Sequence, residues 1–247
     1  MFEVATLCKA GGREYNQDYV GYDTVGKMLC IVVADGLGSY NGSDVASQTA
    51  VDFILNKFHT DAKNRINVLT PDYASSTIAL AHKEVLAKKK ANHEIESSCT
   101  TVVMVITNSE RTVVSHIGDS RAYVIANGKI TYQTRDHSMA QLAVDRGEIQ
   151  FSQIRTHKDQ NKLLRVLGSN HSYIGPDTVL HNQPLKKGDG IAVVTDGWWE
   201  YVYESQLEGM FRSDRSAEEI LTDLEGVVTA TAPPFCDNYS AVIAKKL

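Results

Sequence analysis

Short runs of apolar, mostly β-branched residues recur along the chain and mark the expected strands. Three of these runs stop at an acidic residue: 28–34 at Asp35, 112–117 at Gly118-Asp119, and 191–195 at Asp196. Runs of this length that are bounded by Gly and Asp are typical of strands packed on both faces. We therefore expect buried strands that carry carboxylates at their ends.

Turn residues between neighbouring runs indicate that the strands pair as hairpins. Two such hairpins are expected, and their strands and turns are 100–107 and 111–117 around Asn108-Ser109-Glu110, and 123–126 and 130–132 around Asn127-Gly128-Lys129. Asn-Gly pairs favour tight turns between antiparallel strands. The sheets are therefore expected to be largely antiparallel.

Helical spacing of apolar residues appears in three segments, 45–58, 73–86 and 217–228. Because these helices are grouped instead of alternating with strands, the pattern favours an α+β fold over repeated βαβ units. We expect two packed antiparallel sheets with helices outside them, a four-layer α-β-β-α sandwich. The polar segment 138–175 lacks long strand patterns, and we expect it to form a small flap subdomain of short helices within one domain that spans residues 1–247.

The charge balance is mildly acidic. The 247 residues include 25 Lys plus Arg and 30 Asp plus Glu, which gives a formal net charge of −5. Nucleic-acid binders that rely on phosphate contacts usually carry a positive face, so we expect no nucleic-acid partner. The most basic stretch, Lys88-Lys89-Lys90, is interpreted as the solvated end of a helix.

The N-terminus and the cysteines bear on the compartment. Met1-Phe2-Glu3-Val4 lacks the basic and apolar pattern of a signal peptide, and no apolar run approaches the roughly 20 residues that span a bilayer. Cys8, Cys30, Cys99 and Cys236 are far apart and form no Cys-x-x-Cys pair. We therefore expect a cytoplasmic protein with reduced thiols and no membrane partner.

The acidic strand ends suggest a site. An Asp-Gly pair alone is a common turn signal, but Asp35-Gly36 and Asp196-Gly197 both lead toward helices, and neighbouring strands would bring them together with Asp119. Crowded carboxylates require a cation, and a ligand set made only of oxygens favours Mg²⁺ or Mn²⁺ over zinc. Two such ions bridged by one Asp activate a shared water and clamp a phosphoryl oxygen.

Arg13 supplies a matching group for an anion. A guanidinium can hold a phosphate by two hydrogen bonds, and Arg13 lies shortly before another acidic residue, Asp18. His137 is interpreted as the cap of the first flap helix, and Trp198-Trp199 as packing for the helix after Asp196.

Seven sequence blocks, taken in order, resemble metal-dependent serine/threonine protein phosphatases of type 2C, in particular the bacterial branch. The resemblance covers nearly the whole chain, and the blocks are Arg13-x-x-Asn16-Gln17-Asp18, Val33-Ala34-Asp35-Gly36-Leu37-Gly38, Cys99-Thr100-Thr101, Gly118-Asp119-Ser120-Arg121-Ala122-Tyr123, Asp136-His137-Ser138, Thr195-Asp196-Gly197 and Asp237-Asn238. Seven blocks in one order are far more specific than any one of them.

The resemblance implies a role for each site residue. Asp35 would bridge two Mn²⁺ or Mg²⁺ ions, with the Gly36 carbonyl on one ion and Asp196 and Asp237 on the other. Asp119, helped by Asp196, would hold a third ion. Asp18 would hold metal-bound waters, and Arg13 would bind the phosphate, so that Arg13, Asp18 and Asp35 form the catalytic set.

The resemblance also implies the reaction and the partners. A metal-bridging water would attack the phosphorus of phosphoserine or phosphothreonine in proteins, without a phosphoenzyme, and so reverse a Ser/Thr protein kinase. We expect a monomer whose partners are phosphorylated proteins and a cognate kinase.

Two departures from the family pattern keep an alternative open. Gln17 stands where members often have Glu, and Leu37 stands where many eukaryotic members have a proton-donating His. A neutral amide at position 17 weakens a water-mediated hold on the second ion. The alternative is therefore a catalytically weak, phosphatase-like binding or regulatory module; a third possibility is another metallohydrolase, such as a phosphodiesterase, on the same scaffold.

Overall fold

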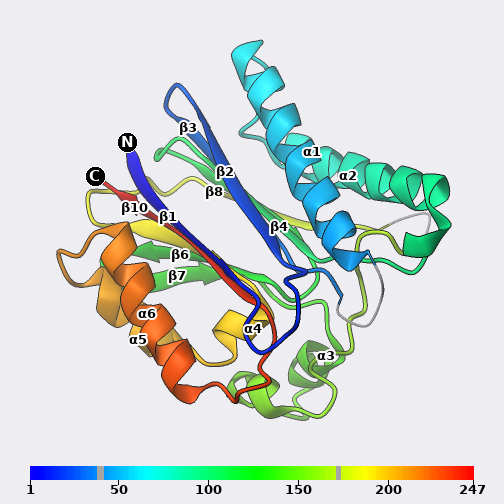
Figure 1. Cartoon of the computed structure of the whole chain (residues 1–247). Helices are drawn as coiled ribbons and strands as arrows, with labels where there is room; N and C mark the ends of the chain where they lie inside the picture. Colours follow the sequence, from blue (N-terminus) through cyan, green and yellow to red (C-terminus); the bar gives the residue numbers. More distant parts are fainter. Residues whose placement is uncertain (38–41, 171–173) are drawn as a thin grey trace.

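Two five-stranded antiparallel sheets stacked face to face form the centre of the computed structural model, which describes residues 1–37, 42–170 and 174–247 (Figure 1). The strands are β1 (Phe2–Lys9), β2 (Tyr19–Val25), β3 (Met28–Ala34), β4 (Val102–Thr107), β5 (Thr112–Ile117), β6 (Arg121–Ala126), β7 (Lys129–Gln133), β8 (Asp177–His181), β9 (Gly190–Val194) and β10 (Tyr239–Lys246). One sheet has the order β1-β10-β9-β6-β7 and the other β2-β3-β4-β5-β8.

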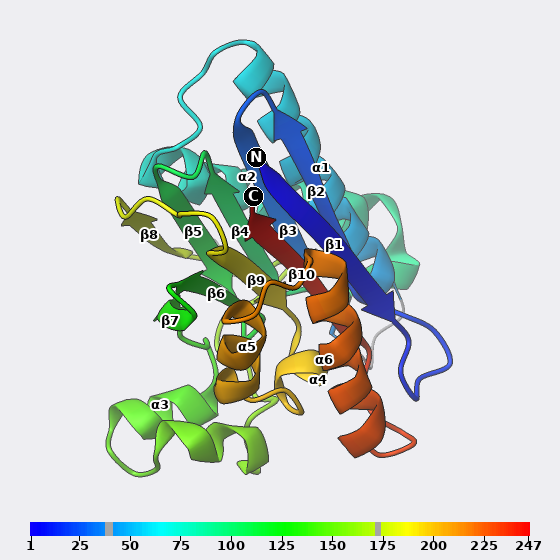
Figure 2. The same ribbon diagram turned by 90° about the vertical axis from the view of Figure 1, so that its left-hand side faces the viewer.

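Helices cover the outer face of each sheet. The helices of the described residues are α1 (Ser43–Lys63), α2 (Pro71–Ala91), α3 (Met139–Asp145), α4 (Asp196–Trp199), α5 (Glu204–Phe211) and α6 (Ala217–Thr231), with 3₁₀ turns η1 (His93–Ile95) and η2 (Phe151–Thr156). In Figures 1 and 2, α1 and α2 lie on the sheet that contains β3, and α5 and α6 lie on the sheet that contains β1 and β10. The predicted four-layer arrangement is confirmed.

The alternation of side chains along β3 shows why the layers form. Ile31 and Val33 point into the apolar core between the two sheets, whereas Val32 and Ala34 point into the core under α1 and α2. All four side chains are fully buried. A strand buried on both faces reads as a continuous apolar run, which is the pattern that the sequence shows.

Both predicted hairpins are present. β4 pairs with β5, and β6 pairs with β7, each in antiparallel register. The second hairpin turns at Asn127 and Gly128, whose φ angles of 54° and 66° give the two left-handed positions that a tight hairpin turn requires. The helices predicted at 45–58, 73–86 and 217–228 correspond to α1, α2 and α6, each somewhat longer than the apolar pattern indicated.

The polar segment 138–175 contains α3 and η2, which lie below the sheets in Figure 2, so the expected short helices are found. Residues 171–173 of this segment lie outside the described residues. The expected role of His137 as the cap of α3 is wrong. Ser138 is the cap and accepts the Gln141 N–H at 3.2 Å, because the Ser side chain is one residue closer to the first turn of the helix.

The interpretation of Lys88-Lys89-Lys90 as a solvated helix end is wrong for Lys89. Its side chain is buried, and its ammonium donates to the carbonyls of Ser98 at 2.8 Å and Gly168 at 2.6 Å. The lysine therefore joins the two connections that carry Ser98 and Gly168 to α2. None of the helices in the described parts of the chain is long and apolar enough to cross a membrane.

Candidate active site

The five acidic residues singled out from the sequence come from five connections at one end of the sandwich. Asp18 lies immediately before β2, Asp35 follows β3, and Asp119 lies between β5 and β6. Asp196 begins α4, and Asp237 lies shortly before β10. The position of α4 in Figure 1 marks this end of the two sheets. Strand ends are suited to hold side chains of a site in place, because a rigid sheet fixes the backbone from which each loop side chain extends.

Asp35 lies at the electrostatic centre of the group. Burial raises its pKa well above the usual range for an aspartate, and the negative charges of Asp196, Asp18, Asp119 and Asp237 raise it further. All four other carboxylates therefore act on Asp35 at short range, as the convergence predicted from the strand ends requires.

The neighbouring carboxylates show the same crowding. The pKa of Asp18 is raised to about 7 by burial and then by the charge of Asp196, and the pKa of Asp196 is raised to about 6 by burial and then by Asp237. A hydrogen bond to Asp35 opposes the rise in both cases. Burial, followed by the charge of Asp196, also raises the pKa of Asp119.

Two carboxylate oxygens in this group have no hydrogen-bond donor among the described residues: Oδ1 of Asp18 and Oδ1 of Asp119, both buried. A buried, unpaired carboxylate oxygen is costly, and a hard divalent cation is a suitable partner for it. Within the described ranges, however, no three acidic, histidine or cysteine side chains stand close enough together to form a complete metal cage as they are. Asp196 Oδ1 instead accepts the Gly197 N–H at 2.6 Å. The unpaired carboxylate oxygens and the negative charge of the five aspartates therefore favour the binding of a cation.

Asp18 is held by a residue to which sequence analysis gave no role. The Thr195 hydroxyl donates to Asp18 Oδ2 at 2.9 Å and accepts the Ser240 N–H at 2.9 Å. Thr195 is fully buried and immediately precedes Asp196, so its hydrogen bond links Asp18 to the segment that carries Asp196. Its place beside Asp196 in the sequence was the available signal.

The backbone of Asp35 is fixed from the start of β4. Thr101 donates its N–H to the Asp35 carbonyl at 2.9 Å, and its hydroxyl accepts the Asp35 N–H at 3.0 Å. The Thr100 hydroxyl donates to the same carbonyl at 2.8 Å. The Thr101 hydroxyl also pairs with the Ser120 hydroxyl at 2.7 Å, which links Asp35 to the loop of Asp119. The Cys99-Thr100-Thr101 block therefore positions two acidic residues.

Gly36 lies where a side chain cannot fit. A β-carbon at this position would stand 2.5 Å from the Ser43 carbonyl oxygen and 2.6 Å from that of Gln17. The Gly36 N–H donates to the Gln17 carbonyl at 3.1 Å. The close approach joins the loop before β2 to the one after β3, and so brings Asp18 near Asp35.

Asp119 is supported by an aromatic side chain and a buried ion pair. The Trp199 indole N–H donates to the Asp119 carbonyl at 3.0 Å. The Arg121 guanidinium lies over the Trp199 ring, 3.6 Å from its centroid, and makes two hydrogen bonds to Asp136 at 2.7 and 2.9 Å. Trp198 and Trp199 are both buried, which confirms their predicted packing role.

Glu200 is a further acidic neighbour that the sequence did not single out. Its pKa is raised to about 8 by burial and then by the charges of Asp196 and Asp237. Its carboxylate accepts a hydrogen bond from the Gln160 amide, which links α4 to the connection after η2.

Arg13 lies beside the acidic group rather than within it. Its guanidinium donates to Asp237 Oδ2 at 2.9 Å, and the Arg13 and Asp237 side chains are 50% and 39% exposed. Asn238 holds the two loops together, because its amide donates to the carbonyls of Ala10 at 2.8 Å and Tyr15 at 3.1 Å. An anion that approaches this edge therefore meets an accessible guanidinium next to the carboxylates.

Comparison with known protein families assigns the chain. The family model described as protein phosphatase 2C matches residues 10–232, a span that includes Asp18, Asp35, Asp119 and Asp196 and ends before Asp237. The chain belongs to the protein phosphatase 2C family. This membership confirms the resemblance drawn from the seven blocks, and with it the expectation of a metal-dependent serine/threonine protein phosphatase.

Individual members of the family are similar at low sequence identity. The serine/threonine phosphatase Stp of Listeria innocua is 28% identical over 212 residues, which cover 84% of this chain and 81% of that protein. The crystal structure of the serine/threonine phosphatase Stp1 of Staphylococcus aureus superimposes with a TM-score of 0.85 at 23% identity, and covers 100% of this chain and 96% of that one. The catalytic domain of the phosphatase PstP in complex with two manganese ions gives a TM-score of 0.80 at 23% identity, over 99% and 97% of the two chains.

The two departures from the family pattern have different settings. Gln17 is buried, and its backbone is part of the site: its N–H donates to Asn238 Oδ1 at 2.8 Å, and its carbonyl accepts from Gly36. Leu37 donates its N–H to the Cys99 carbonyl at 3.0 Å. Gly38, the last residue of that sequence block, lies outside the described residues.

Proposed function

We propose that this protein phosphatase 2C member hydrolyses phosphoserine and phosphothreonine in proteins at the acidic end of its sandwich, and so reverses the action of a Ser/Thr protein kinase. The observation that carries the proposal is the convergence of four carboxylates on Asp35, each of which raises the pKa of that residue. A monoester phosphate brings negative charge of its own, so a site this acidic needs divalent cations to accept it.

The metal-holding residues in this proposal are Asp18, Asp35, Asp119, Asp196 and Asp237, together with the carbonyl of Gly36. The unpaired buried oxygens of Asp18 and Asp119 and the all-oxygen donor set suit Mn²⁺ or Mg²⁺. A relative that binds two manganese ions supports the choice of metal. When bound, such ions supply an activated water and neutralise the charge that develops on the phosphoryl group.

The residues of the chain then divide the remaining work. Arg13 binds the phosphate oxygens through its partly exposed guanidinium. To do so, the guanidinium either releases Asp237 or donates to both the Asp237 carboxylate and the phosphate. Thr195 and Thr101 hold Asp18 and Asp35 in place, so little reorganisation is needed during the reaction. Leu37 has an apolar side chain and therefore cannot protonate the leaving oxygen.

The test is phosphate release from a phosphothreonine peptide by purified protein with added Mn²⁺. We expect turnover by the unchanged chain and a loss of at least about a hundredfold in Asp35→Asn and Asp196→Asn. Both substitutions keep the shape of the side chain and remove one charge, so a folded variant isolates the electrostatic role. Full activity in Asp196→Asn would show that the site is misassigned, and no release by the metal-loaded wild-type protein would overturn the proposal.

The binding-module alternative predicts a different result for the same protein. A module without turnover would bind phosphopeptide but release no phosphate. Gln17 is the residue that raises this alternative; it is buried, and its backbone N–H donates to Asn238 Oδ1 at 2.8 Å. The carboxylate set next to it favours the phosphatase.

Loss of a kinase-dependent phosphorylation pattern on overexpression of the chain, measured by phosphoproteomics, tests the proposed opposition to a kinase.

A further inference from the structure

Two exposed aromatic side chains stand on the two loops that join at the proposed phosphate site. Phe235 lies between α6 and β10 and is 77% exposed, and Tyr15 lies between β1 and β2 and is 51% exposed. A single exposed aromatic residue is unremarkable. Here the two flank Arg13, since Tyr15 is two residues after it and Phe235 is two residues before its partner Asp237.

The two loops form one rigid edge. The Gly12 N–H donates to the Cys236 carbonyl at 3.0 Å. A β-carbon on Gly12 would stand 2.5 Å from the Cα of Phe235, so the two backbones are in direct contact. Asn238 adds a hydrogen bond to the Tyr15 carbonyl from the Phe235 side. These contacts hold the backbone that carries the two aromatic side chains, so a ligand that covers them needs no ordering of the loops.

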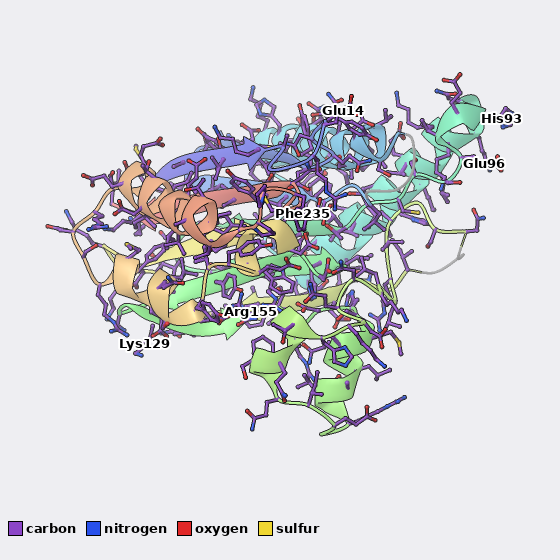
Figure 3. The ribbon with its side chains drawn as sticks, turned by 60° about the horizontal axis from the view of Figure 1, so that its bottom comes forward. Glu14, His93, Glu96, Lys129, Arg155 and Phe235 are labelled. Carbon is purple, nitrogen blue, oxygen red and sulfur yellow. The ribbon has the colours of Figure 1, made fainter. Side chains whose placement is uncertain are left out.

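The edge is within reach of a bound peptide. An extended chain advances about 3.3–3.6 Å per residue, and the Cα of Phe235 is next to the residue that precedes Arg13. A peptide whose phosphate sits on Arg13 can therefore reach this edge within about three residues of its phosphorylated residue. In Figure 3, Phe235 lies on the face turned to the viewer, between the loop that carries Glu14 and the α3 segment.

We propose that Phe235 and Tyr15, which we call the aromatic rim, bind a large apolar side chain of the substrate within three residues of its phosphoserine or phosphothreonine. The inference rests on the proposed function of the site. The occupant is apolar because both rim residues expose large aromatic side chains, and because the exposed Glu14, which stands between Arg13 and Tyr15 in the chain, repels acidic neighbours. The rim thereby selects substrates, while the carboxylates and Arg13 act on the phosphate.

Two phosphothreonine peptides test the rim. One carries Leu at the two positions before and after phosphothreonine, and the other carries Ala there. We expect the unchanged protein to prefer the Leu peptide about tenfold in kcat/KM, as partial burial of a leucine side chain predicts. In Phe235→Ala the preference falls to about twofold, and Phe235→Leu keeps most of it. The ratio between peptides is the readout, because a change in the amount of active enzyme cancels from it.

Ile66→Ala is the matched control, because Ile66 is 48% exposed and lies after the far end of α1. It should leave the preference unchanged. A Phe235→Ala protein with the wild-type ratio, or a wild-type protein with no preference, overturns the inference. Hydrolysis of p-nitrophenyl phosphate shows separately whether the site is active. If it is not, anisotropy of labelled peptides measures the same preference as binding, and equal affinities for the two peptides refute the rim.

Discussion

Thr101 offers a specific test of how the fold positions the central carboxylate. Its fully buried hydroxyl accepts the N–H of Asp35 at 3.0 Å and pairs with Ser120 at 2.7 Å. Thr101→Val keeps the shape of the side chain and removes this acceptor. A buried N–H left without a partner costs about 1–3 kcal/mol. For a chain of this size that corresponds to a melting temperature lower by about 2–12 °C.

The loss of the Thr101 hydroxyl should also weaken metal binding. Residues that orient a ligand from behind typically change metal affinity or activity by about 10–100-fold when they are altered. We therefore expect Thr101→Val to bind Mn²⁺ about 10–100-fold more weakly, since the Asp35 N–H loses its acceptor and the link to Ser120 is lost. The assay is isothermal titration calorimetry with Mn²⁺ on protein first treated with EDTA, together with thermal melting in the same buffer.

Thr101→Ser is the control for this experiment. It retains the acceptor and loses one methyl group that packs near Gly118, at a cost of about 1 kcal/mol. Its Mn²⁺ affinity should stay at the wild-type value even though its stability falls. If Thr101→Val and Thr101→Ser bind Mn²⁺ equally well, the hydroxyl does not position Asp35 and the reasoning is refuted.

Three further predictions follow from the same contacts. In EDTA, the free energy of unfolding should fall as the pH rises from about 4 to 7. The reason is that Asp18 and Asp196, with folded pKa values of about 7 and 6, hold protons that the unfolded chain, with pKa near 3.8, has released. Urea titrations at pH 5 and 8 should show the fall, and Asp18→Asn should make the free energy of unfolding depend less on pH; a free energy that rises with pH would contradict the prediction. Asp136→Ala should cost about 3–5 kcal/mol, because it leaves the buried Arg121 guanidinium without its two hydrogen bonds, and a midpoint in urea equal to wild type would rule this out. Gly36→Ala should abolish Mn²⁺-dependent phosphate release or prevent folding, since its β-carbon meets two backbone carbonyls, and a soluble, active Gly36→Ala protein would disprove the close approach.

Much of the fold could be predicted because one physical rule governs the strands. A strand such as β3, buried between a second sheet and a pair of helices, must be apolar at every position, and this makes it visible in the sequence. α3 and η2 gave only weak signals, because short helices that pack on few residues carry little periodicity. Sequence pattern also could not show that Lys89 turns inward, since its partners are backbone carbonyls from distant segments.

The site divides along a similar line. Asp35, Asp119 and Asp196 could be predicted because each follows a recognisable strand, and Asp18 and Asp237 because the seven blocks resemble a known family. The groups that support them could not be assigned, because the role of Thr195 or Trp199 depends on contacts across the sandwich. The same holds for the ion pair between Arg13 and Asp237, which are more than two hundred residues apart in the chain.

The central claim is that the five carboxylates hold divalent cations, and a Mn²⁺ titration of the wild-type and Asp35→Asn proteins tests it most directly. Asp35 lies at the centre of the group, and the charges of all four other aspartates act on it. We expect saturable binding of at least two ions by the EDTA-treated wild-type protein, and loss of the tight sites in a folded Asp35→Asn protein. Equal Mn²⁺ binding by the two proteins, or no binding by either, would contradict it.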